Sequence, residues 1–280
     1  LSIYLSIYLS IHPSIYLSQA LLPFARFYRE HAPAGLNLGR IDGADWKTVR
    51  TSMARHMMPP KEAQSFIPNL ERVMRDCSGG LRGHGGAVDE YVPLMTYEMI
   101  CSILLDRRPG IVRGAAADLD ERFVRTSRRV FPLMAELMAP EEMPRFLRGD
   151  SPVYAEFERA MLDVMDMGEE FIDEFLERFE RHRDDPTHTV HSSYFAKMLT
   201  HEQGVLNKHQ MNINFSNLIF AGVDTTSNVV QWMFYHLARN PGVQDKMRAE
   251  MRDTLGGRDV ETSQDFKALK YCKQVMKETY

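Results

Sequence analysis

The sequence predicts a globular, mainly α-helical protein, and two observations lead to this prediction. Apolar residues recur every three or four positions over long stretches, as on one face of a helix, and these stretches stop at breaks that contain Gly or Pro. Hydrophobic residues make up 44% of the chain and charged residues 26%, which is the balance of an ordinary globular protein. The formal net charge of −4 gives no argument for a nucleic-acid partner.

Residues 1–18 stand apart from the rest. They repeat Leu-Ser-Ile-Tyr with a period of four, interrupted near His12-Pro13. The segment is too polar for a membrane span, which needs roughly 20 mostly apolar residues, and it lacks the positive start of a signal peptide. A tetranucleotide tract read in triplets would give the same repeat. We therefore expect residues 1–18 to be an unstructured low-complexity segment or a gene-model artefact, and residues 19–280 to form a partial helical domain.

The helical body includes an early helix for which Asp45 is a candidate N-cap. The Gly-rich residues 77–87 match no phosphate-binding motif and predict a surface loop. Apolar helices are expected over residues 91–105, 118–138 and 154–182, because breaks rich in Pro and Gly separate them.

Residues 221–228 read Ala-Gly-Val-Asp-Thr-Thr-Ser-Asn inside a long apolar helix that ends at Asn240-Pro241. These are poor helix formers, and a local conflict of this kind is typical of a functional site. Gly222 lets a bulky group approach the backbone, and Asp224 places a carboxylate where burial is costly. Thr225 and the next threonine can bond back to carbonyls one turn earlier. The alternative is a bent core helix with a polar seam.

This octet resembles the oxygen-activating helix of the cytochrome P-450 superfamily, whose pattern is A/G-G-x-D/E-T-T; these haem-thiolate monooxygenases are the usual example of cysteine-ligated haem. The resemblance implies a P-450 fold truncated at both ends, with the helical core retained and most of the β regions missing. It also implies that Asp224 and Thr225 are the acid–alcohol pair that delivers protons during oxygen activation. Ala221 and Gly222 would then lie against the haem.

Trp46 and Arg50 form a W-x-x-x-R pattern and lie four residues apart, hence on one helical face. On spacing alone they suit an amphipathic helix with an exposed arginine. The family carries this pattern where both residues contact a haem propionate, and the planar fork of arginine binds a carboxylate bidentately. The continuation to Ala63 and the ending at residues 105–110 resemble the mitochondrial branch of the family. That branch implies the matrix side of the mitochondrial inner membrane; the alternative is the endoplasmic reticulum membrane.

Glu278 fits the glutamate of the family's E-x-x-R signature, which would make it half of a buried structural ion pair. Without the family it is a solvated charge near a helix end. Lys273 and Lys277 match positions where the mitochondrial branch receives an acidic, ferredoxin-type electron donor. Lysine is also the ordinary exposed residue of a helix end.

None of the three cysteines, Cys77, Cys101 and Cys272, has the flanks of the family's haem-ligand loop, F-x-x-G-x-x-x-C-x-G. Each is interpreted as a reduced thiol, so we expect no metal ligand in this chain. The chain starts with Leu1 and stops at Tyr280, inside an apparent helix. We therefore expect an internal fragment that is inactive by itself. The histidines do not show the spacing of a zinc site and are expected to be solvated or capping; these are His182, His188, His191, His201 and His209.

The expected function is that of a monooxygenase that uses haem (iron protoporphyrin) to insert one atom of O2 into a small lipophilic, sterol-like substrate, with electrons ultimately from NADPH. Sterols, secosteroids, fatty acids and xenobiotics all remain open as substrates. Peripheral membrane contact is also expected, and the weak candidates for contact with substrate or membrane are Leu133, Met134, Leu137 and Met138. The alternatives are a haem-free helical protein that binds partners or lipids, and a non-functional gene product.

Overall fold

The computed structural model describes residues 22–31, 38, 41–83, 87–202 and 204–279. The regular elements of this part of the chain are all helices, which confirms the mainly α prediction. The repeat at residues 1–18 lies outside the described residues.

Thirteen α-helices and two short 3-10 helices are described in this part. In chain order they are α3 (Leu22–His31), α4 (Gly43–Arg55), α5 (Pro60–Ser65), α6 (Ile67–Gly83), α7 (Val88–Leu104), η1 (Ile111–Arg113), α8 (Asp118–Leu137), α9 (Met143–Arg148), α10 (Pro152–Arg181), η2 (Thr189–Ser192), α11 (Tyr194–His201), α12 (Lys208–Arg239), α13 (Pro241–Leu255), α14 (Ser263–Ala268) and α15 (Lys270–Glu278).

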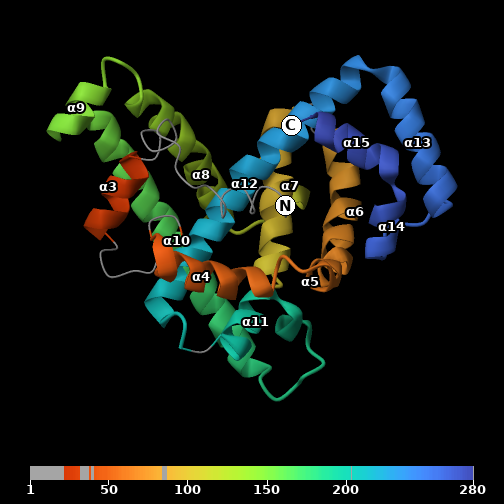
Figure 1. Ribbon diagram of the computed structural model, residues 1–280, viewed down its shortest axis with the longest axis horizontal. Coiled ribbons are helices and arrows are strands. Elements are labelled where there is room, and N and C mark those ends of the chain that lie inside the picture. Colours follow the sequence, from red (N-terminus) through yellow and green to blue (C-terminus); the bar gives the residue numbers. More distant parts are fainter. Residues whose placement is uncertain (1–21, 32–37, 39–40, 84–86, 203, 280) are drawn as a thin grey trace.

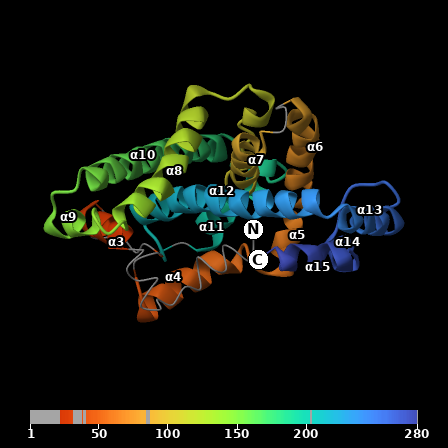
Figure 2. The same cartoon turned by 90° about the horizontal axis from the view of Figure 1, so that it is seen from above.

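The long helix α12 runs through the middle of the molecule (Figure 1). Helices α7, α8 and α10 pack on one side of it, and α4 lies on the other side (Figure 2). Residues 212–223 of α12 are all buried, whereas no residue of α12 after Ser227 is. The helix begins at a capping box, in which the side chains of Asn207 and Gln210 each accept a hydrogen bond from the other's backbone N–H. It ends before Pro241, as the sequence predicts.

The segment between α7 and α8 is held by two buried carboxylates. Asp120 accepts a hydrogen bond from Tyr97 Oη at 2.6 Å and bonds from both terminal nitrogens of Arg107. Glu98 accepts a bond from Arg108 Nε at 2.9 Å. The predicted break after α7 is therefore confirmed. Its two arginines, Arg107 and Arg108, pair with the buried carboxylates of Asp120 and Glu98.

Two expectations about local structure are wrong. Residues 77–83 are not a loop, because α6 continues to Gly83. Gly80 faces α7 so closely that an added Cβ would lie 2.3 Å from Tyr91 Oη, and that hydroxyl donates to the Cys77 carbonyl at 3.0 Å. Packing between two helices thus outweighs the low helix propensity of glycine. Asp45 is not the N-cap, since α4 starts at Gly43 and Asp45 lies within its first turn.

The helices expected over residues 91–105, 118–138 and 154–182 are confirmed within a few residues. Leu133 and Leu137 of α8 are fully buried in the core, which excludes them from membrane contact. No helix in the described residues is long and apolar enough to cross a bilayer.

Candidate functional site

The octet at residues 221–228 is helical throughout, in the middle of α12. Thr225 Oγ1 donates a hydrogen bond to the Ala221 carbonyl at 2.7 Å, which is the predicted bond to the preceding turn. Ala221 and Gly222 are buried, whereas Asp224 and Thr225 are half-buried. The octet therefore spans the point at which α12 passes from the core to the surface.

Asp224 is the titratable group of this segment. Burial raises the pKa of its carboxyl above the ordinary value, while the positive charge of Arg128 and a bond from Asn228 act in the opposite direction. The bond from Asn228 Nδ2 to Asp224 Oδ2 is 3.3 Å long. A carboxyl that is half-buried and holds its proton more tightly than usual can exchange protons between solvent and a buried site.

A second hydroxyl cluster, which the sequence did not indicate, lies two residues further along the helix. Ser227 Oγ donates to the Val223 carbonyl, and Thr96 Oγ1 of α7 lies 2.7 Å from Ser227 Oγ. Thr96 also donates to the Val223 carbonyl at 3.1 Å. This buried cluster fixes the octet against α7. From the sequence, Ser227 predicts only the hydrogen bond to the carbonyl four residues earlier, that of Val223. The contact with Thr96 joins two helices that are distant in the sequence, so only the structure reveals it.

Gly222 lies at the same helix contact. An added Cβ would be 3.0 Å from Cδ1 and Cγ1 of Ile100 in α7, which is tight. The structure therefore gives Gly222 a packing role, because a larger residue would require the buried Ile100 side chain to shift. Contact of Ala221 and Gly222 with a haem stays a prediction.

Trp46 and Arg50 lie on α4, on the other side of α12. Trp46 is partly buried and packs against the core. The Nη1 atom of Arg50 is buried and has no hydrogen-bond partner among the described residues, and burial lowers the pKa of its guanidinium. A buried cationic donor without an acceptor is costly, and a carboxylate would satisfy it. No hydrogen bond or ion pair in the described structure joins this pair to the octet.

The three cysteines are poor candidates for thiolate ligands. Burial raises the pKa of Cys77 to about 11, of Cys101 to about 12 and of Cys272 to about 11. A metal-bound cysteine is a thiolate, which these surroundings disfavour.

Comparison with known families assigns the chain. The family model for cytochrome P450 matches residues 19–280. The chain belongs to the cytochrome P450 family. Its relatives include the mitochondrial sterol 26-hydroxylase of Rattus norvegicus, which is 26% identical over 263 residues; the match covers 90% of this chain and 48% of the relative.

Two further relatives of this P450 chain carry mitochondrial names. The mitochondrial 1,25-dihydroxyvitamin D(3) 24-hydroxylase of Mus musculus is 24% identical over 259 residues, covering 90% of this chain and 48% of the relative. The probable mitochondrial cytochrome P450 12c1 of Drosophila melanogaster is 23% identical over 248 residues, covering 85% and 46%. The chain thus spans about half the length of the curated relatives it matches.

Membership in the family implies haem, and the residues of α4 fit that group. The unsatisfied Nη1 of Arg50 is the donor that an anionic propionate would accept from, and the indole N–H of Trp46 on the same face can supply another.

Helix α13 holds the start of the last described helix, α15, through hydrogen bonds that a single glutamate accepts. Glu250 of that helix accepts hydrogen bonds from the backbone N–H groups of Tyr271 and Cys272 at 2.7 and 2.8 Å, which caps the start of α15. Glu278 is exposed and forms no ion pair within the described residues. Lys273 and Lys277 are both exposed.

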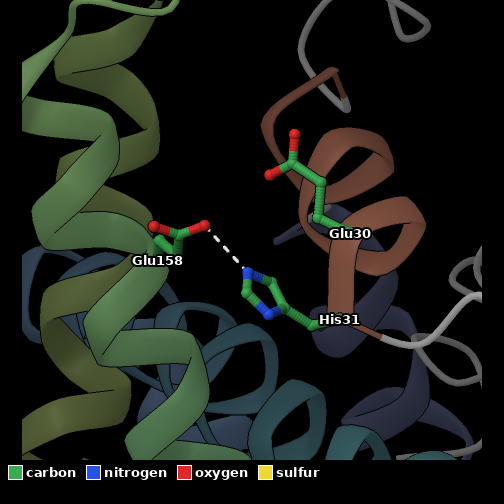
Figure 3. Close-up of side chains that lie close together, drawn as sticks. All are labelled: Glu30, His31 and Glu158. Carbon is green, nitrogen blue, oxygen red and sulfur yellow. Dashed lines mark hydrogen bonds and ion pairs between the residues drawn. The ribbon is translucent and has the colours of Figure 1, made fainter.

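One group of side chains in the described structure lies close enough to share a metal ion. Figure 3 shows Glu30, His31 and Glu158, whose ligand atoms lie within 4.8 Å of one another. His31 Nε2 is 2.8 Å from Glu158 Oε1, and Glu30 accepts a hydrogen bond from Arg26 Nε at 3.0 Å. Because that guanidinium would repel a cation, we interpret the group as a link between α3 and α10. Among the other histidines, His188 caps η2 through Nδ1, in agreement with the expected capping role.

Replacing Asp224 with Asn is expected to raise the free energy of unfolding at neutral pH. The folded chain binds the Asp224 proton more tightly than the unfolded chain, whose pKa is near 3.8, so ionisation above the folded pKa costs stability. The gain in D224N should shrink as pH falls through the folded pKa and vanish below 3.8. R128M should enlarge the gain, because Arg128 lowers this pKa. Urea denaturation across pH measures both; a gain that does not change with pH would contradict the assignment.

Proposed function

We propose that the protein represented by this chain is a haem-dependent monooxygenase that inserts one atom of O2 into a lipophilic substrate. The observation that carries the proposal is the buried Nη1 atom of the partly buried Arg50, which has no hydrogen-bond partner among the described residues. It occurs in a cytochrome P450 that also places an acid and an alcohol side by side at Asp224 and Thr225 in α12. The alternative of a haem-free helical protein gives no reason for a buried Arg50 Nη1 atom that lacks an acceptor within the described part of the chain.

The bound haem would supply the reduction of O2. Arg50 and Trp46 would hold it by donating hydrogen bonds to a carboxylate. Asp224, half-buried at the edge of the core, would take a proton from solvent and hold it on a carboxyl whose pKa burial raises. Thr225 directs its own proton to the Ala221 carbonyl, which leaves its oxygen free to accept a hydrogen bond.

We further propose a sterol-like substrate and a mitochondrial location at the inner membrane, on the matrix side. The names of the relatives, sterol 26-hydroxylase and 1,25-dihydroxyvitamin D(3) 24-hydroxylase, support both. Electrons would come from NADPH through a ferredoxin-type donor that meets the exposed Lys273 and Lys277. Leu147 of α9, with 68% of its surface exposed, is a better candidate for peripheral membrane contact than the buried Leu133 and Leu137.

The test is a haem titration of this chain, followed by Soret absorbance. R50M is expected to weaken binding at least about tenfold, because a hydrogen bond from a charged group contributes about 1.5–3 kcal/mol. K47M removes an exposed cation from the same helix and should leave the affinity unchanged within about twofold. Equal losses in both variants, or no haem binding by the chain, would contradict the proposed role of α4. We also expect the reduced carbonyl complex to lack a thiolate-type Soret band, since none of the three cysteines favours a thiolate.

A further inference from the structure

A groove separate from the octet and from α4 runs between α7, η1 and α8. Its volume is about 600 Å³, which is within the range of sites for small organic molecules. Leu94 of α7, Ile111 of η1 and Val124 of α8 contribute apolar side chains to its lining. Ile111 and Val124 are buried, so these side chains form a fixed apolar floor. We call this cavity the α8 groove.

The rim of the α8 groove is basic. Arg125, Arg128 and Arg129 line it from α8, and Arg128 and Arg129 follow Arg125 by three and four residues, so each is a neighbour of Arg125 on the helix surface. Like charges at this spacing repel each other, by about 0.2–0.5 kcal/mol per pair. Glu121 is the acidic residue of the lining, so the lining as a whole carries a net positive charge.

The three arginines differ in the number of ion pairs and hydrogen bonds that they form with the rest of the protein. Arg129 is neutralised by Glu156 at 3.0 Å and by Glu136 at 3.5 Å. Arg128 donates to the backbone carbonyl of Asp89 at 3.2 Å and interacts electrostatically with Asp224, but it forms no direct ion pair with a described carboxylate. Arg125 is exposed and makes no hydrogen bond or ion pair with any described residue. Two guanidinium groups at the rim are thus available to an anion.

We propose that the α8 groove binds an organic anion that combines an apolar body with a compact carboxylate head. The body would lie on the aliphatic floor, and the head would accept hydrogen bonds from Arg125 and Arg128. The planar fork of a guanidinium matches a carboxylate, and the apolar floor gives no partner to a fully polar ion such as inorganic phosphate. Binding at this rim weakens as salt is added, because the head remains near solvent.

Octanoate is the probe, and its neutral counterpart is 1-octanol. In a methyl NMR titration of this chain, octanoate is expected to shift the methyl signals of Leu94, Ile111 and Val124 saturably. R125Q/R128Q should weaken binding at least about tenfold. R122Q removes a cation from the same helix outside the groove lining and should change the affinity less than about twofold. Octanol should bind at least about tenfold more weakly than octanoate.

Three outcomes would overturn the proposal. These are equal affinities for octanoate and octanol, an R125Q/R128Q variant that binds as the unchanged chain does, or shifts confined to other regions such as the exposed half of α12. The last outcome would mean that octanoate binds at another site. Failure of this proposal is distinguishable from failure of the proposed function, because the octanoate titration tests the α8 groove whereas the haem titration tests α4. Unchanged methyl signals of the variants in the absence of octanoate establish that they remain folded.

Discussion

The R107M variant is expected to lose about 3–5 kcal/mol of unfolding free energy, which is the usual cost of removing one partner from a buried ion pair. Asp120 is only 1% exposed, and its carboxylate accepts from both terminal nitrogens of Arg107, one of them at 2.9 Å. Tyr97 Oη is its other donor, at 2.6 Å. Methionine cannot neutralise the carboxylate, so the variant leaves a charge in the core. Urea denaturation of R107M and the unchanged chain measures the difference.

The matched control is R183M. Arg183 pairs with Glu180 at 3.4 Å, with 69% of its side chain exposed, so its removal should cost less than about 1 kcal/mol. In the double variant R107M/D120N the loss should be smaller than the sum of the single losses, because the asparagine carries no charge to strand. Equal losses in R107M and R183M would mean that Arg107 is not the counter-charge of Asp120.

The G168A variant is expected to lose about 1–3 kcal/mol, the range for overpacking a core. Gly168 of α10 faces Ser216 of α12, and an added Cβ would lie 2.1 Å from Ser216 Oγ and 3.2 Å from its Cα. Rotation of the serine hydroxyl cannot relieve the second contact, so the two helices must separate. The same urea denaturation measures the loss.

The control is G79A. Gly79 lies inside α6 and an added Cβ meets nothing within 4 Å, so alanine should be neutral or stabilise by up to about 1 kcal/mol. In the G168A background, S216G removes the atoms nearest to the added Cβ and should recover part of the lost unfolding free energy. The recovery is incomplete because S216G places a new glycine inside α12, which itself costs stability. If G168A and G79A behave alike, the close approach of α10 and α12 is not what requires glycine at residue 168.

Much of the fold could be predicted from local patterns. The apolar spacing of α7, α8 and α10 and the stop at Pro241 arise from interactions within a few residues, so they are readable along the chain. The bond from Thr225 to the Ala221 carbonyl is of the same kind, since it spans one helical turn. The limits of this approach appear at Gly80, where contact with Tyr91 keeps α6 helical through a segment whose composition indicates a loop.

The sequence by itself determined the residue types of the candidate site and their order: an acid beside an alcohol in α12, and an indole and a guanidinium on one face of α4. Only the tertiary structure decided the surroundings of those groups. It placed Thr96 against Ser227, left Arg50 Nη1 buried with no acceptor among the described side chains and backbone, and set Arg128 near enough to act on Asp224. The reason is physical: burial and charge depend on side chains brought together from distant positions, whereas helical spacing depends on neighbours in the chain.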